Sequence, residues 1–240
     1  MLQAKLDRVA VALDTSDRNE FGRWCRLFGP RVGVLKVGLE CFCRFGSSGV
    51  EEARRHARKL FLDLKLHDIP NTVTGAVTAV RSLGADLVTV HAAGGRTMLS
   101  AAVEAAEEMK ILAVTLLTHI DEAELAALDL EGSGARRVRK WAQLARQSDC
   151  AGIVCSPREL QALRPTLPAP FLLVTPGIRP SGANRDDQRR VATPAEALAG
   201  GSDLLVIGRP LTRSSDPEAA LEGLAEEIEA SERAASGRPG

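Results

Sequence analysis

Eight short apolar runs recur along the chain, and they constrain its fold more than any other feature. They read RVAVALD, VGVLKVG, KLFLDLKL, DLVTVHA, ILAVTLLT, GIVCS, FLLVTPGI and DLLVIGRP. The runs are rich in Val, Ile and Leu, as expected of strands buried on both faces of a parallel sheet. Segments with helical spacing of apolar residues lie between them, which is typical of repeated strand–helix units.

Polar side chains gather at the carboxyl ends of these runs, and this distribution favours a barrel over an open sheet. Barrel enzymes build their sites at that end from several strands, whereas an open doubly wound sheet concentrates them near one switch point. The residues are Asp14, Lys36, Asp63, Lys65, His91, Thr118, Ser156, Arg179 and Arg209. We therefore predict one (β/α)8 TIM barrel over residues 1–240, with 234–240 as a frayed tail, and keep the open sheet as the alternative.

The segments between the runs contain residues that are typical of helix ends. Asp17 and Glu20 form a possible capping pair ahead of an amphipathic segment. A later stripe of Val73, Val77 and Val80 closes on Gly84, which suits a helix C-terminus. Before the last helical segment, Asp216 precedes a proline and is the expected N-cap.

Composition excludes several classes of function. The formal net charge is +0 and the pI is about 6.9, so no basic field predicts a nucleic-acid partner. The 5 Cys are odd in number and lack the spacing of a zinc site or a disulfide framework, which fits a reducing cytoplasm. Because the chain has no apolar run of about 18 residues or more, we expect no membrane span.

The third apolar run, FLDLKLHDIPNTV, carries charges that a buried strand should avoid. Asp63 and Lys65 share one face because strand side chains alternate, and Asp68 follows just past the strand. Asp14 and Lys36 end the two neighbouring strands, so these charges should converge. Since a buried charge is costly unless it is paired, the cluster is either a salt-bridge network that closes the barrel or a catalytic site.

A lysine held between carboxylates suits one kind of chemistry. The nearby negative charge keeps its ammonium protonated, which makes it a poor Schiff-base former and a good proton donor. Such a site fits a reaction in which negative charge develops on carbon and the carbon then takes a proton. A substrate carboxylate near Asp63 or Asp68 would be repelled and lost as CO2, while the ammonium stabilises the developing carbanion.

The last two runs are followed by a candidate phosphate site. In many barrels the loops after strands seven and eight bind phosphate through backbone N–H groups. Gly177 and Gly208 would let the backbone approach an anion, and Arg209 and Arg179 would add charged hydrogen bonds. The alternative is a pair of ordinary turns with surface arginines.

Three further polar residues are weaker candidates. The Thr118 hydroxyl is placed to bond a polar heterocycle, although a plain strand-end threonine is the alternative. Gln188 lies in a polar loop, and His91 is a candidate acid or base whose simpler role is a bond to its neighbours. No HExxH motif, second inward histidine or paired cysteines predict a catalytic metal.

Taken in order, these motifs closely resemble the orotidine 5′-phosphate decarboxylase family in its compact bacterial form. The resemblance runs from about Val9 to Thr212 and rests on FLDLKLHDIPNTV together with the seven motifs VALD, LKVG, VTVHAAGG, LAVTLLT, VTPGIRP, DQRRVATP and IGRPLT. It implies decarboxylation of orotidine 5′-monophosphate to UMP and CO2, the last step of de novo pyrimidine synthesis. It also implies that neither a metal nor an organic cofactor takes part.

The resemblance further implies a role for each member of the charged cluster. Lys65 would donate the proton to C6 of the pyrimidine, and Asp63 would lie beside the substrate carboxylate. Lys36 and Asp14 would contact the ribose and complete the charge network.

The remaining residues would bind other parts of the substrate or join two subunits. The family is a homodimer with sites at the interface, so Asp68 and Thr72 would reach the partner's site. Thr118 would bind the base, and Gln188 would bridge base and phosphate. The phosphate would be held by Arg179, Gly208 and Arg209.

Two other functions stay open at this point. One is a magnesium-dependent sugar-phosphate decarboxylase or hexulose-phosphate synthase, which shares the D-x-K-x-x-D spacing. The other is a barrel that binds a nucleotide phosphate without catalysis, although such a protein should have lost part of the charge network.

Overall fold

Eight parallel strands pair in chain order, and the first also pairs with the last, which closes a barrel. The computed structural model describes residues 5–130, 132–181 and 191–237. The predicted TIM barrel is confirmed, and the closing pair excludes the open sheet. The strands are β1 (Val9–Ala12), β2 (Val34–Gly38), β3 (Leu60–Leu66), β4 (Leu87–His91), β5 (Lys110–Val114), β6 (Gly152–Val154), β7 (Leu172–Thr175) and β8 (Leu204–Ile207).

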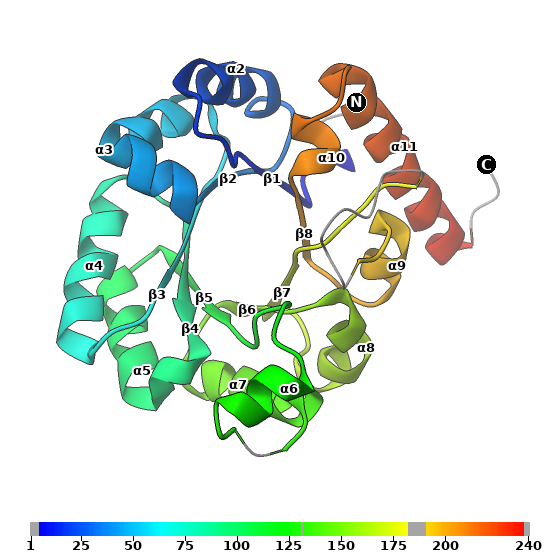
Figure 1. Ribbon diagram of the computed structural model, residues 1–240. Helices are drawn as coiled ribbons and strands as arrows, with labels where there is room; N and C mark the ends of the chain where they lie inside the picture. The colour runs from blue at the N-terminus through cyan, green and yellow to red at the C-terminus, as the bar shows by residue number, and fades with distance from the viewer. Residues whose placement is uncertain (1–4, 131, 182–190, 238–240) are drawn as a thin grey trace.

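Helices surround the barrel, and Figure 1 shows them as an outer ring in a view down the barrel axis. They are α2 (Arg18–Phe28), α3 (Leu39–His56), α4 (Pro70–Ser82), α5 (Gly95–Ala106), α6 (Glu122–Ala127), α7 (Gly134–Gln147), α8 (Leu160–Leu163), α9 (Pro194–Ala199), α10 (Arg209–Thr212) and α11 (Pro217–Ser236). The described ranges also contain three 3-10 turns: η1 (Ala92–Gly94), η2 (Pro157–Glu159) and η3 (Arg164–Thr166).

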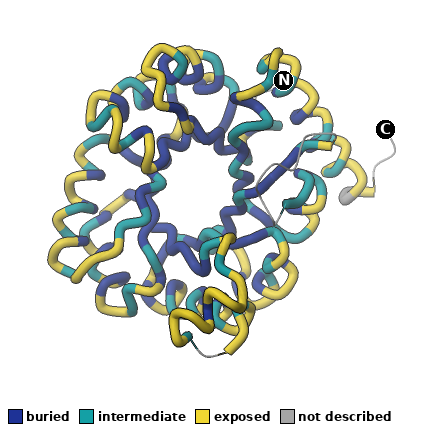
Figure 2. The backbone as a smooth tube through the Cα atoms, viewed as in Figure 1, coloured by how far each residue is buried: buried dark blue, intermediate teal, exposed yellow. Residues whose placement is uncertain are grey.

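Two hydrophobic cores hold this arrangement together. A small core fills the inside of the barrel with one residue from each of seven strands: Ala10, Val34, Phe61, Leu87, Leu112, Val174 and Leu204. A larger core lies between the strands and the helices, so the strands are buried on both faces. Figure 2 shows this as a buried ring of strands within helices whose outer sides are exposed.

The predicted helix signals are found, with one difference. The Asp17 side chain caps α2 by accepting from the N–H groups of Asn19 and Glu20 at 2.7 and 3.1 Å. Glu20 does not return to the cap, because its carboxylate accepts from the Thr15 hydroxyl at 2.6 Å. Asp216 caps α11 as expected.

The last helix runs into the segment that was predicted to be a frayed tail. α11 extends to Ser236, and residues 238–240 of that segment lie outside the described residues. Gly237 then takes φ +64° and its N–H bonds the Ala234 carbonyl, so a glycine in the left-handed region ends the helix there.

Candidate active site

Four charged side chains form a continuous line at the carboxyl end of the barrel. Lys65 Nζ donates to Asp63 Oδ1 at 2.8 Å. On the other side, Lys36 Nζ lies 3.4 Å from Asp63 Oδ2 and 3.6 Å from Asp14 Oδ1. The structure therefore brings Asp14, Lys36, Asp63 and Lys65 together from three neighbouring strand ends, as their spacing predicted.

A missing side chain makes room for this line. Gly38 pairs with Asp63 across β2 and β3. A Cβ atom at Gly38 would lie 2.5 Å from Asp14 Oδ1, which is too close for that carboxylate to stay in place, and 3.1 Å from Lys36 Nζ, which is a tight contact. Only glycine at this position lets Asp14 approach the buried lysine.

The line is electrostatically self-consistent. Lys36 is only 5% exposed, and burial works against its charge, but Asp63 and Asp14 raise its pKa above the ordinary value. Burial also works against the Asp63 carboxylate, but Lys36 and Lys65, with hydrogen bonds from Lys65 and Thr89, lower its pKa. Lys36 and Asp63 are therefore both charged at neutral pH. Each charge stabilises the other one in a buried position.

The backbone at Lys65 departs from a regular strand. Lys65 has φ +52°, a region that residues with a side chain rarely adopt. The pairing of β3 with β4 shifts register between Leu62 and Leu66, which is a β-bulge around this residue. The Lys65 N–H donates at 2.9 Å to the hydroxyl of Thr89 on β4, which in turn donates to Asp63 Oδ1 at 3.0 Å.

Asp68 and Thr72 stand apart from the other predicted residues within one chain. Asp68 is exposed, and its carboxylate accepts from the Ile69 N–H at 2.7 Å. Throughout the described ranges no lysine or arginine nitrogen lies within 4.0 Å of it. Thr72 is exposed in the first turn of α4. The chain therefore closes its charge line without the third residue of D-x-K-x-x-D.

Two adjoining cavities open onto the charged line. One has a volume of about 240 Å³ and the other about 200 Å³. Both are lined by Lys36, Asp63, Pro176 and Val206, so the charges lie where the two meet. A ligand with two chemically different halves would place the junction of those halves beside the lysines.

The first cavity holds the residues that were predicted to bind phosphate. Gly177, Arg179, Gly208 and Arg209 all line it. Gly177 has φ +80°, so its turn requires glycine. Gly208 does not adopt a left-handed conformation, but a Cβ there would lie 3.4 Å from the Ala12 Cβ, so the loop packs closely on β1. Arg179 is buried and donates to the Ile178 carbonyl at 3.0 Å.

The second cavity is more apolar and contains the end of Lys65. Thr118 lines it, as does Phe61 from the barrel interior. Apolar walls with a few polar groups are typical of sites that bind small molecules. Gln188, the residue expected to bridge the two halves, lies outside the described residues.

Sequence reasoning missed several lining residues, and the signal for some of them was present. Pro176 and Val206 lie two positions from inward-facing residues of β7 and β8, so the strand alternation alone would have placed them. Strand alternation also places Thr89 on the same face as His91, two positions later. Thr89 was nevertheless missed, because it is a single polar residue inside an apolar run and belongs to no charged motif.

His91 lies at the end of β4 beside the charged line. Its ring centroid is 5.3 Å from that of His67. Burial lowers its pKa, and the charges of His67 and Lys65 act in the same direction, while Asp63 opposes them. A neutral imidazole is therefore expected here at neutral pH.

The described ranges hold neither a cluster of metal ligands nor a membrane-spanning helix. No group of three or more His, Cys, Asp or Glu side chains there could hold a metal ion. None of the helices in those ranges is long and apolar enough to cross a membrane.

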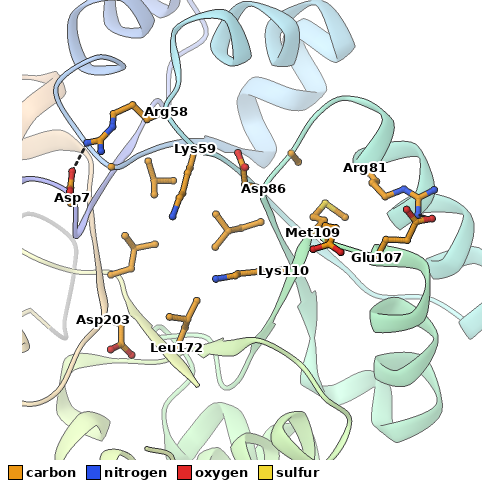
Figure 3. Close-up of a pocket in the computed structure, with 16 residues that line it drawn as sticks. Asp7, Arg58, Lys59, Arg81, Asp86, Glu107, Met109, Lys110, Leu172 and Asp203 are labelled. Carbon is orange, nitrogen blue, oxygen red and sulfur yellow. Dashed lines mark hydrogen bonds and ion pairs between the residues drawn. The ribbon is translucent and has the colours of Figure 1, made fainter. Parts of the chain in front are cut away.

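A wider cavity of about 760 Å³ lies at the opposite, amino-terminal mouth of the barrel. Figure 3 shows Lys59 and Lys110 pointing into it, with the Arg58–Asp7 ion pair at its edge. A further ion pair, Arg54–Asp86 at 2.6 Å, ties the same end together. Both ion pairs lie at the amino-terminal mouth, the end of a barrel that usually serves stability.

Comparison with known proteins gives a consistent result. The model of the Orotidine 5'-phosphate decarboxylase / HUMPS family matches residues 7–224. An orotidine 5'-phosphate decarboxylase of Thermobifida fusca is 52% identical over 223 residues, which is 92% of this chain and 95% of that protein. One from Moorella thermoacetica is 45% identical over 233 residues, or 93% and 92% of the two chains.

A solved structure agrees with these sequences. The crystal structure of orotidine 5'-phosphate decarboxylase from Lactobacillus acidophilus superposes with a TM-score of 0.81 at 36% identity, covering 92% of this chain and 98% of the other. A family match over nearly the whole barrel, with relatives of similar length, leaves one assignment. The chain belongs to the orotidine 5'-phosphate decarboxylase / HUMPS family.

Proposed function

We propose that the protein decarboxylates orotidine 5′-monophosphate to UMP and CO2 in pyrimidine biosynthesis. The observation that carries this proposal is the line of alternating charges at the junction of two cavities. One cavity offers glycines and arginines to a phosphate, and the other offers apolar walls to a pyrimidine. The family and the names of its close relatives support the same reaction.

In this reaction Lys65 is the proton donor. The bond between C6 and the carboxylate carbon breaks, CO2 leaves, and the electron pair remains on C6. The Lys65 ammonium stabilises that developing negative charge and then transfers its proton to C6, which gives UMP. Its Nζ is held at 2.8 Å by Asp63, which fixes the position of the proton before the substrate arrives.

Asp63 and Lys36 have complementary tasks. The Asp63 carboxylate would face the substrate carboxylate, and that repulsion is relieved when CO2 leaves. Lys36 and Asp14 would bind ribose hydroxyls at the junction of the cavities, where both line the first cavity. Lys36 also keeps Asp63 ionised, which the proposed repulsion requires.

The phosphate would bind in the first cavity, remote from the reacting carbon. Arg179 and Arg209 would contribute charged hydrogen bonds, and Gly208 would allow a close approach of its loop. Thr118 would bond the base in the second cavity, and Gln188 would bridge the two halves. Binding energy from the phosphate would then hold the ring against Lys65.

The proposal includes a homodimer with shared sites. Asp68 and Thr72 are exposed beside the mouth of the barrel, where they would reach the site of a second copy. Ile69, between them in sequence, is 66% exposed, and Leu39 is 54% exposed, which a partner surface would cover. The five cysteines are free thiols, in keeping with the cytoplasm as the compartment.

The dimer has a direct test. Asp68→Asn and Lys65→Ala should each inactivate their homodimers. If Asp68 serves the neighbouring site, a heterodimer reassembled from the two variants carries one intact site and regains part of the activity. A monomer in sedimentation analysis, or no gain on mixing, would remove this part of the proposal.

The function itself is tested by the ultraviolet absorbance of orotidine 5′-monophosphate on addition of the purified protein, with EDTA present. Loss of the orotate chromophore with formation of UMP is the expected result, and no metal or organic cofactor should be needed. Lys65→Ala should abolish turnover and leave the fold intact. Lys59→Ala, at the other end of the barrel, should leave turnover unchanged.

Two other outcomes would favour the alternatives. Turnover of a sugar phosphate only with added magnesium would identify a sugar-phosphate decarboxylase or a hexulose-phosphate synthase. Binding of UMP without turnover of any substrate would indicate a barrel without catalysis.

A further inference from the structure

Thr89 lies beneath the charged line, and neither the motifs nor the comparisons give it a task. We propose that Thr89 is a positioning residue for the reaction, which holds Lys65 and Asp63 in their working geometry through one hydroxyl group. The inference rests on the proposed function and extends it to a residue that does not touch substrate.

The hydroxyl sits between the backbone of one residue and the carboxylate of the other. Thr89 is 0% exposed. Its Oγ1 accepts from the Lys65 N–H at 2.9 Å and donates to Asp63 Oδ1 at 3.0 Å. The direction of the second bond is fixed, because an ionised carboxylate only accepts and the hydroxyl has one proton to give.

These bonds close a ring with the site itself. Asp63 Oδ1 accepts both the Thr89 hydroxyl and Lys65 Nζ, the latter at 2.8 Å. The ring therefore runs from the Lys65 N–H through Thr89 and Asp63 back to the ammonium of the same lysine. Asp63 Oδ2 is left for Lys36 at 3.4 Å. One hydroxyl thus sets which carboxylate oxygen faces which lysine.

The bulge in β3 explains why such a residue is needed. With φ +52°, Lys65 turns its N–H away from the regular pairing of β3 with β4. A buried N–H without a partner is costly, and a positive φ adds strain. Thr89 supplies the acceptor, and so it stabilises the backbone conformation from which the Lys65 side chain reaches Asp63.

The hydroxyl also favours the ionised form of Asp63. Its hydrogen bond is one of the causes that lower the pKa of that carboxyl, alongside the two lysines. A variant without the hydroxyl should therefore protonate Asp63 at a higher pH than the wild type does. A loss of packing alone would not change the pH at which Asp63 takes up its proton.

The experiment compares three substitutions. Thr89→Val keeps the shape and removes the hydroxyl, and Thr89→Ser keeps the hydroxyl and removes a methyl group. Thr175→Val is the matched control, because Thr175 is also 0% exposed but its hydroxyl accepts from Ser202 Oγ at 2.8 Å, away from the lysines.

Decarboxylation is measured against pH, together with the titration of the Asp63 carboxyl carbon by NMR. Thr89→Val should lower kcat roughly tenfold to a hundredfold, the range for a hydrogen bond to a charged group, with little change in KM. It should also move the acid limb of the pH profile and the Asp63 titration to higher pH. Thr89→Ser should restore both, and Thr175→Val should move neither.

Several results would overturn the inference. One is a Thr89→Val enzyme with the wild-type pH profile and wild-type Asp63 titration, whatever its melting temperature. Another is an equal loss in the Val and Ser variants, which would assign the effect to packing. If the Val variant does not fold, Thr89→Ala makes the same comparison, and activity within about twofold of wild type would reject the role.

The two readouts separate this inference from the proposed function. A wild-type protein that does not turn over orotidine 5′-monophosphate refutes the function. The Asp63 titration still decides whether Thr89 holds that carboxylate, because it needs no substrate.

Discussion

Replacement of Lys36 by methionine tests whether the charged line holds the barrel together as well as serving the site. Lys36→Met keeps most of the volume of the side chain and removes its charge from a position that is only 5% exposed. Asp63 would lose a cation at 3.4 Å, and Asp14 would lose one at 3.6 Å. Methionine also removes the cost of burying the ammonium, and this gain offsets part of the loss.

The magnitude follows from what Asp63 retains. Leaving a buried charge unpaired costs about 3–5 kcal/mol. In Lys36→Met, Asp63 keeps Lys65 at 2.8 Å and Thr89 at 3.0 Å, and Asp14 is half exposed to water. We therefore expect the free energy of unfolding at pH 7 to fall by about 2 kcal/mol, less than for a fully unpaired charge.

The pH dependence gives a second signature. The folded-state pKa of Asp63 lies below the ordinary 3.8, so its ionised form stabilises the fold above that pH, and this contribution is lost as the pH falls through the folded value. Without Lys36 the folded-state pKa of Asp63 rises. The acid unfolding midpoint should then move to higher pH.

Urea denaturation at pH 7 and an acid titration followed by circular dichroism measure both effects. Lys59→Met is the control, since Lys59 is an exposed lysine at the opposite end of the barrel (Figure 3), and its loss should change stability by less than about 0.5 kcal/mol. A Lys36→Met variant as stable as the wild type, with the same acid midpoint, would show that the line contributes nothing to the fold.

Two further predictions concern neighbours of the line. Gly38→Ala places a Cβ 2.5 Å from Asp14 Oδ1 and should displace that exposed carboxylate. We expect kcat/KM to fall roughly tenfold to a hundredfold while the melting temperature hardly changes. Gly75→Ala is the control, because a Cβ there meets nothing within 4 Å and should leave kcat/KM unaltered. For His91, burial and the charges of His67 and Lys65 lower the pKa, so the unfolded chain takes up the proton first, and the free energy of unfolding should fall as the pH drops below 6.5. Urea denaturation at pH 7.5 and 5.5 should show a smaller fall in His91→Gln, and equal falls would contradict the reasoning.

The sequence predicted the architecture because the barrel depends on local patterns. Seven of the eight apolar runs contain a whole strand, and the fifth misses only Lys110 at the start of β5. Asp17 and Asp216 cap the helices that they were expected to cap. The line of Asp14, Lys36, Asp63 and Lys65 also followed from alternation and strand order. These features need only neighbouring residues and adjacent strands.

The parts that were missed depend on contacts between distant residues. Thr89 bonds Asp63 across 26 positions, and Gly38 matters only because Asp14 approaches it in space. The conformation of Lys65 breaks the period that was used to place it, and no local pattern in β3 announces the bulge. Asp68 lies past the bulge and is exposed in the single chain, and its role at a partner's site stays a prediction.

The register of β3 explains how a bulge and a charged line can occupy the same strand. Up to Asp63 the strand pairs regularly with β2, with Phe61 opposite Lys36 and Asp63 opposite Gly38. A slip of one residue there would turn Asp63 out of the barrel and Leu62 or Leu64 into it, so the apolar alternation protects the position of the carboxylate. The register shift against β4 lies between Leu62 and Leu66, so the strand can re-aim Lys65 on that side while Asp63 keeps its regular pairing with β2. The hydrogen bonds of Thr89 bridge this irregular stretch, because its hydroxyl contacts both the Asp63 carboxylate and the Lys65 N–H. The strand thereby fixes the carboxylate by its register and the ammonium by a side chain of the next strand.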